Sequence, residues 1–216
     1  MTQFKVLISI ILVLELFGLP SPVLAQLNQT RKQIIVIDPG HGGKDSGAVG
    51  INGIQEKEIV LKIAKQIIEL NETAFKDKFE IYLTRYKDTL ISLGDRTKLA
   101  KSLNTDIFIS LHCNHSDNPN ARGIEVYVSK KQGKYSRKSI LLAYDLQKGL
   151  KKNLGFESRG VKFGDFQVLR ETVNECPPIL LEMGFLSNKY EVNFLKIGKN
   201  TFSIASKILG FLNQKT

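Results

Sequence analysis

The sequence has little of the residue types that build disulfide scaffolds, zinc ribbons and aromatic sugar platforms. Tryptophan is absent, and the 216 residues include two cysteines and three histidines. Two cysteines are too few for a disulfide-rich fold, and no CxxC pair is present for a zinc ribbon. Any carbohydrate contact must therefore use tyrosine, phenylalanine or polar groups. The chain also lacks internal repeats and low-complexity tracts, which excludes solenoid and disordered architectures.

The composition is otherwise that of an ordinary globular domain with an excess of positive charge. Hydrophobic residues make up 42% and charged residues 24% of the sequence, a balance typical of one domain around one core. Lysine and arginine outnumber aspartate and glutamate by 31 to 21, which gives a net charge of +10. A basic protein is attracted to polyanions such as nucleic acid, anionic membranes or acidic cell-wall polymers. Charge alone does not choose among these partners.

Residues 1–25 have the pattern of a secretory signal peptide. Lys5 gives a positive start, Val6–Leu14 form an apolar run, and Val23-Leu24-Ala25 fits a small-residue cleavage site. The apolar run is shorter than the ~20 residues of a membrane span. We therefore expect cleavage and no stable membrane span afterwards, with an uncleaved N-terminal anchor as the alternative. A protein exported to the periplasm, the cell wall or the cell exterior is not expected to meet nucleic acid.

Short apolar strands alternate with amphipathic helices along the rest of the chain. After a flexible start at residues 26–33, we expect one domain over residues 34–216. This alternation predicts an α/β fold, a three-layer sandwich with a mainly parallel central sheet of about six strands flanked by helices. The expected strands are 34–37, 80–84, 106–113, 124–128, 166–169 and 179–182. The expected helices are 56–71, 92–103, 139–153, 190–195 and 201–212, and core contacts from the third of these are expected at Ile140, Leu141, Tyr144 and Leu150.

Two of the three histidines lie where a parallel sheet exposes its ligand-binding edge. His41 follows the first predicted strand and His112 ends the third, and the carboxyl ends of parallel strands face the same crevice. Glu56 begins the first predicted helix, directly after a glycine-rich loop. Two imidazoles and one carboxylate can hold a catalytic zinc ion, which keeps a fourth position open for water. The alternative is structural: loop histidines, and a glutamate that complements a helix dipole.

Glu182 ends the last apolar strand and is the candidate proton shuttle. A carboxylate that closes an apolar strand is costly unless it has a function or a partner, and it could carry a proton between water and a leaving amine. A salt bridge to a lysine or arginine is the structural alternative. Cys113 follows His112 directly, so its side chain is expected on the opposite face of the strand. Whether Cys113 pairs with Cys176 stays open.

A series of short motifs occurs in one order between Ile34 and Leu212. They are Ile37–Gly47 (IDPGHGGKDSG), Glu56–Glu58 (EKE), Leu83–Arg85 (LTR), Leu93–Arg96 (LGDR), Asp106–Asn114 (DIFISLHCN), Arg159–Lys162 (RGVK), Val168–Arg170 (VLR) and Leu181–Asn188 (LEMGFLSN). Together they resemble the zinc-dependent N-acetylmuramoyl-L-alanine amidases of the type-3 amidase family. Because several motifs recur in one order, the resemblance is more specific than any single motif.

The resemblance implies a peptidoglycan hydrolase with one zinc ion per chain. The ion would be held by His41, Glu56 and His112, and Glu182 would act as general base and acid on zinc-bound water. The bond cleaved would be the amide between the lactyl group of N-acetylmuramic acid and L-alanine. Two rival enzyme classes with the same metal and base are a zinc exopeptidase and a deacetylase. The non-enzyme alternative is a wall-binding module that has lost catalysis. Such a module would be expected to lack a metal ligand or Glu182, and this chain keeps all four residues.

Three further residues are candidate substrate contacts. Arg159 and Lys162 could meet carboxylates of muropeptides, and Asn114 lies at the end of the motif that contains His112. His115 stands where the family more often has a small residue. It could add a fourth nitrogen near the metal or bind substrate, but we expect it to be an exposed loop residue. We expect the protein to be a monomer.

Overall fold

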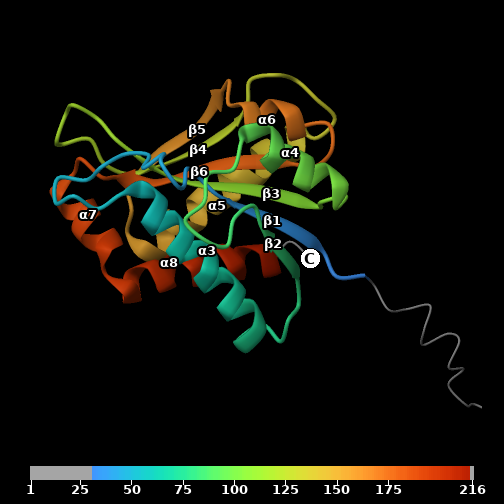
Figure 1. Ribbon diagram of the computed structural model, residues 1–216, viewed down its shortest axis with the longest axis horizontal. Coiled ribbons are helices and arrows are strands. Elements are labelled where there is room, and N and C mark those ends of the chain that lie inside the picture. Colours follow the sequence, from blue (N-terminus) through green and yellow to red (C-terminus); the bar gives the residue numbers. More distant parts are fainter. Residues whose placement is uncertain (1–30, 215–216) are drawn as a thin grey trace, which may run out of the picture. The chain divides into compact units, whose positions relative to one another are not determined.

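A six-stranded sheet forms the centre of the fold (Figure 1). The computed structural model describes residues 31–214. The strands are β1 (Ile34–Pro39), β2 (Glu80–Leu83), β3 (Ile107–Asn114), β4 (Ile124–Ser129), β5 (Ser158–Gly164) and β6 (Pro178–Phe185), in the spatial order β2-β1-β3-β6-β4-β5. Four of the strand pairings are parallel, and β4 pairs with β6 in the antiparallel sense. The predicted mainly parallel sheet is therefore confirmed.

Helices cover both faces of this sheet, as the expected three-layer sandwich requires. On one face lie α3 (Glu56–Thr73), α5 (Ser136–Leu154) and α8 (Gly198–Asn213), and on the other lie α4 (Leu93–Ser102) and α6 (Gln167–Thr172). The short helix α7 (Lys189–Lys196) packs against α8 and β6. Among the described residues, no helix is long and apolar enough to cross a membrane. The predicted signal peptide and most of the predicted flexible start lie outside the described residues.

The core has two parts because side chains alternate across each strand. In β1, Ile35 and Ile37 point into the larger cluster beneath α3, α5 and α8, whereas Val36 points into the smaller cluster beneath α4 and α6. The two cysteines lie on opposite sides of the sheet. Cys113 is buried in the larger cluster and Cys176 in the smaller one, and both thiols are free. Cys113 therefore faces away from the side of the sheet to which its neighbour His112 belongs, as expected.

One predicted strand is wrong and one observed strand was not expected. Residues 166–169 lie at the start of helix α6, with Phe166 as the N-cap, and the fifth strand is instead Ser158–Gly164. A short segment with three apolar residues out of four fits a buried helix turn as well as a strand. Strand β5 lies at the edge of the sheet and has no fully buried residue, so its sequence does not show the apolar pattern of a central strand.

The buried face of helix α5 also differs from the prediction. Leu141 and Tyr144 are exposed, at 56% and 57% of their surface, while Leu142, Ala143 and Leu146 are buried. Leu150 is buried as expected. The helix begins at Ser136, three residues earlier than predicted, and its apolar stripe is rotated by about one position. Several apolar residues in succession allow more than one stripe, and packing against β4 and β5 selects among them.

Candidate metal centre

His41, Glu56 and His112 converge at the carboxyl edge of the sheet. Each offers one ligand atom, and these atoms lie within 4.8 Å of one another. The Glu56 carboxylate lies between the two imidazoles, with Oε2 at 3.1 Å from Nε2 of His41 and Oε1 at 2.8 Å from Nδ1 of His112. Three segments that are distant in sequence therefore supply a compact set of two nitrogens and one carboxylate.

The Glu56 carboxylate is fixed by its surroundings and is ionised. It is the first residue of an 18-residue helix, where the helix dipole favours negative charge. The backbone N–H of Ala48 donates to Oε2 at 2.8 Å, and that of Cys113 donates to Oε1 at 2.9 Å. Burial acts to raise the pKa of Glu56, but hydrogen bonds with His112 and His41 hold that pKa far below its usual value. A charged, oriented carboxylate is the form that binds a cation.

His41 is oriented by a second carboxylate. Its Nδ1 lies 2.8 Å from Oδ2 of Asp45, so Nε2 is the atom that faces Glu56. Burial lowers the pKa of His41, but the hydrogen bonds with Glu56 and Asp45 outweigh it and raise the pKa to about 9. A carboxylate that fixes the ring and tautomer of a histidine is the usual outer support of a metal ligand.

Two buried arginines hold the loop that carries His41. Arg85 donates to the carbonyls of Pro39 at 3.0 Å and Gly40 at 2.8 Å. Arg96 donates to the carbonyl of His41 at 2.8 Å. Arg96 is itself anchored by an ion pair with Asp38 at 2.6 Å. These bonds stabilise a backbone turn in which His41 has a φ of 60°, a conformation that is costly for a residue with a side chain.

Gly40, the residue after β1, allows the backbone to pass directly against the ring of His112. A Cβ at position 40 would lie 2.3 Å from Cε1 of that ring, which is far closer than any ordinary contact. The absence of a side chain at this position is therefore required for the two histidines to approach. Their ring centroids are 5.0 Å apart in an edge-to-face arrangement.

Glu182 lies on β6 in register with His112 on β3, with both side chains on the same face. Its Oε2 is buried and accepts no hydrogen bond from the described part of the chain. Burial raises the pKa of Glu182 to about 7. A pKa raised in this direction suits a group that accepts and releases a proton near neutral pH.

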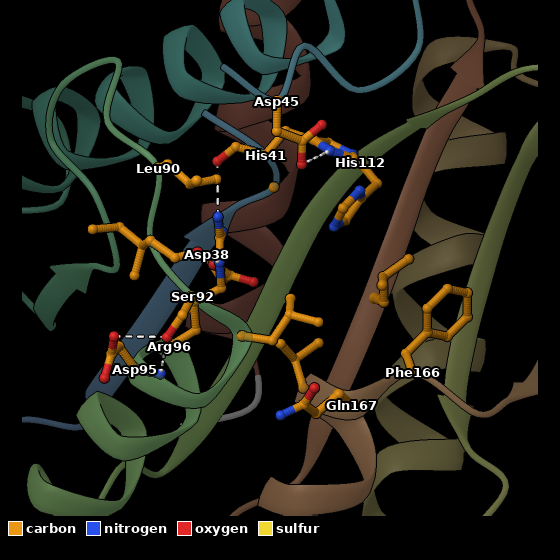
Figure 2. A pocket seen from close by; sticks show the side chains of 15 residues that line it. Asp38, His41, Asp45, Leu90, Ser92, Asp95, Arg96, His112, Phe166 and Gln167 are labelled. Carbon is orange, nitrogen blue, oxygen red and sulfur yellow. Dashed lines mark hydrogen bonds and ion pairs between the residues drawn. The ribbon is translucent and has the colours of Figure 1, made fainter. Parts of the chain in front are cut away.

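A cavity of about 620 Å³ opens beside the two histidines. Figure 2 shows His41, Asp45 and His112 at one end, with Phe166 and Gln167 from the start of α6 on the far side. Leu90 and Arg96 line the side formed by the loop before α4 and by α4 itself. The cavity places mixed polar and apolar surface next to the candidate metal ligands.

The three predicted substrate contacts gather around a residue that sequence reasoning missed. Glu125 on β4 accepts hydrogen bonds from Arg159 at 2.5 Å, Lys162 at 2.7 Å and Asn114 at 3.2 Å. The sequence does contain a signal for Glu125: like Glu182, it is a carboxylate within an otherwise mostly apolar strand. His115 is exposed and is not part of the His41, Glu56 and His112 group.

Comparison with known proteins identifies the family. The family model described as N-acetylmuramoyl-L-alanine amidase matches residues 35–214. The amidase LytC of Bacillus subtilis is 38% identical over 165 residues, which cover 76% of this chain and 32% of LytC. The endolysin of Bacillus phage SPP1 is 37% identical over 167 residues, which cover 76% of this chain and 59% of the endolysin. This chain thus matches about a third and about three fifths of these two relatives.

Solved structures agree with the sequence comparisons. The catalytic domain of CwlV, an N-acetylmuramoyl-L-alanine amidase from Bacillus (Paenibacillus) polymyxa var. colistinus, superposes with a TM-score of 0.76 and 33% identity, covering 85% of this chain and 97% of that domain. An N-acetylmuramoyl-L-alanine amidase from Clostridium difficile 630 gives a TM-score of 0.77 and 31% identity, covering 86% and 97%. The fold, the ordered motifs and the family match over residues 35–214 lead to one conclusion: this chain belongs to the N-acetylmuramoyl-L-alanine amidase family.

Proposed function

We propose that this protein hydrolyses the amide bond between N-acetylmuramic acid and L-alanine in peptidoglycan, using one zinc ion per chain. The observation that carries the proposal is the convergence of three ligand atoms within 4.8 Å, beside a buried carboxyl group on the next strand. Family membership supports the substrate class.

The donor set fits a catalytic zinc ion. Two imidazole nitrogens and one carboxylate oxygen are a typical set of three protein ligands, and they leave a fourth position for water. His41, Glu56 and His112 would hold the ion, and Asp45 would keep His41 in the ligating orientation. When bound, zinc supplies a water molecule of lowered pKa and polarises the scissile carbonyl.

Glu182 carries the proton in this proposal. Amide hydrolysis adds the oxygen and one hydrogen of water to the carbonyl carbon, and the other hydrogen goes to the departing nitrogen as the carbon–nitrogen bond breaks. Ionised Glu182 accepts that hydrogen as a proton, and protonated Glu182 delivers it to the nitrogen of L-alanine. Its pKa of about 7, raised by burial, suits both steps at neutral pH.

The remaining expectations concern where the protein works. We propose that residues 1–25 are a cleaved signal peptide and residues 26–33 a flexible start, that residues 34–216 act as a monomeric catalytic domain, and that the protein is exported to the periplasm, the cell wall or the exterior. Its net charge of +10 would favour contact with anionic wall polymers. The LytH proteins of Staphylococcus epidermidis, 35% identical, carry the name probable cell wall amidase.

The decisive experiment is mass analysis of purified sacculi digested with and without a chelator. We expect intact stem peptides with a free L-alanine amino group, and no product after chelation until zinc is restored. Shortened peptides would identify a zinc exopeptidase instead, and free amino sugars a deacetylase. If the protein bound sacculi but released no product, it would be a wall-binding module and not an enzyme.

A further inference from the structure

A buried carboxylate on β4 holds two cations at one of its oxygens. The side chain of Glu125 is 3% exposed, and its Oε1 accepts from Nε of Arg159 at 2.5 Å and from Nζ of Lys162 at 2.7 Å. Its Oε2 accepts from the Tyr127 hydroxyl at 2.8 Å and from the Asn114 amide at 3.2 Å. Four donors thus fix the Glu125 carboxylate from both sides.

The cluster of Glu125, Arg159 and Lys162 has a net charge of +1. A single cation would neutralise Glu125, yet Arg159 and Lys162 are both present, and their side chains are 39% and 38% exposed. The ammonium group of Lys162 has three donors, of which Glu125 takes one. The partly exposed Arg159 and Lys162 side chains therefore have N–H groups that Glu125 does not use, and these groups face the solvent. This is the chemistry of a receptor for one carboxylate.

The cluster lies on the same row of the sheet as the candidate metal centre. His112, Glu182 and Glu125 are register partners on three adjacent strands, β3, β6 and β4, and β5 follows as the next strand (Figure 1). At a strand spacing of about 4.8 Å, the Cα atom of Glu125 is about 10 Å from that of His112. An extended peptide advances about 3.5 Å per residue, so the cluster is two to three residues from a bond cleaved at the metal.

We propose that Glu125 is a positioning residue that fixes Arg159 and Lys162 as a receptor for the carboxylate on the second residue of the stem peptide. The receptor would direct the peptide side of the substrate along β4 and β5 and place the amide beside Glu182. This inference rests on the proposed amidase function, because the peptide must be the leaving group of that reaction.

The test compares three synthetic substrates of the form N-acetylmuramoyl-L-alanyl-D-glutamyl-L-lysine. In the first, the second-residue carboxylate is free and the C-terminus is amidated. In the second, both groups are amidated, and in the third the C-terminal carboxylate alone is free. We expect the wild-type protein to favour the first over the second by about tenfold in kcat/KM, through KM, and to treat the second and third alike.

Two variants separate positioning from a structural role. In Glu125→Gln the preference for the first substrate over the second should fall to less than twofold. Lys162→Met keeps the Glu125–Arg159 pair and should lose most of the preference even if Glu125→Gln folds poorly. The matched control is Glu157→Gln, which removes an exposed glutamate paired with Arg122 just before β5 and should leave the preference intact.

The results that would contradict the carboxylate receptor differ from those that would contradict the amidase function. Cleavage of all three substrates at equal rates by the wild type would overturn the carboxylate receptor and leave the amidase function standing. A preference for the third substrate alone would overturn the assignment to the second residue. An equal loss of activity on every substrate in both variants would show a structural role for the cluster. No cleavage of any substrate, or of sacculi, would overturn the proposed function itself.

Discussion

Glu182 lies directly opposite His112 on the neighbouring strand, in the parallel register that pairs β6 with β3. The pairing brings a carboxyl group next to a candidate metal ligand, and Oε2 of Glu182 is buried and accepts no hydrogen bond from the described residues. A group held in this way is free to exchange a proton with a substrate or a water molecule. In the proposed mechanism the metal ligand and the proton carrier are therefore two different groups.

Replacing Glu182 by glutamine should remove turnover and keep the metal. Glutamine has nearly the same shape but cannot accept and release a proton at neutral pH, so we expect kcat to fall by about 10²–10⁴-fold. Zinc content, measured by elemental analysis of the purified variant, should stay at one ion per chain. A variant that digests sacculi at near wild-type rate would remove Glu182 from the mechanism.

The same substitution should stabilise the metal-free protein at alkaline pH. Burial raises the pKa of Glu182 from 4.5 to about 7, so folding favours the protonated form. The resulting stabilisation is complete below pH 4.5 and is lost as the pH rises through 7, a loss of about 3 kcal/mol. Glu182→Gln does not ionise and should escape this loss. Urea denaturation of chelated protein should give a larger advantage for the variant at pH 8 than at pH 4.5, and equal differences at both would contradict the assignment.

Removal of His112 should eliminate zinc binding, whereas removal of a nearby histidine should not. His112 contributes one of the three converging ligand atoms, so His112→Ala should lose zinc and activity together. His115→Ala is the matched control, because His115 is exposed, three residues further along the chain, and outside that group. Zinc titration followed by isothermal calorimetry should show tight binding for His115→Ala and none comparable for His112→Ala. Equal affinities would place the metal elsewhere.

A methyl group at position 40 should displace the His112 ring. The Cβ of Gly40→Ala would lie 2.3 Å from Cε1 of His112, so the ring or the β1 turn must shift. We expect at least tenfold weaker zinc affinity and a matching loss of activity. Gly149→Ala, in helix α5 with no atom near the added carbon, should instead raise stability by about 0.5–1 kcal/mol and leave zinc affinity unchanged. Unaltered zinc affinity in Gly40→Ala would contradict the close approach.

The sequence by itself was enough to predict the strands and helices that have strong local patterns, and the candidate site residues that follow them. The continuous apolar run of β1 and the periodic stripe of α3 are strong enough to predict both elements. His41, Glu56, His112 and Glu182 were expected at or beside element ends, although strand β6 continues three residues past Glu182, to Phe185. Because parallel strands end at one edge of a sheet and the helix that Glu56 begins follows the first of them, those positions were sufficient to predict that His41, Glu56 and His112 would converge.

Tertiary structure alone decided the features that depend on which strands become neighbours. The run at 166–169 became a helix and the polar segment at 158–164 became the edge strand β5, since a short apolar run fits either form and an edge strand needs no apolar pattern. The Glu125 cluster exists because β4 runs antiparallel to β6 and parallel to β5, which places Arg159, Lys162 and Glu182 around one residue. Strand order arises from contacts between segments that are distant in the sequence, so a local pattern does not determine it.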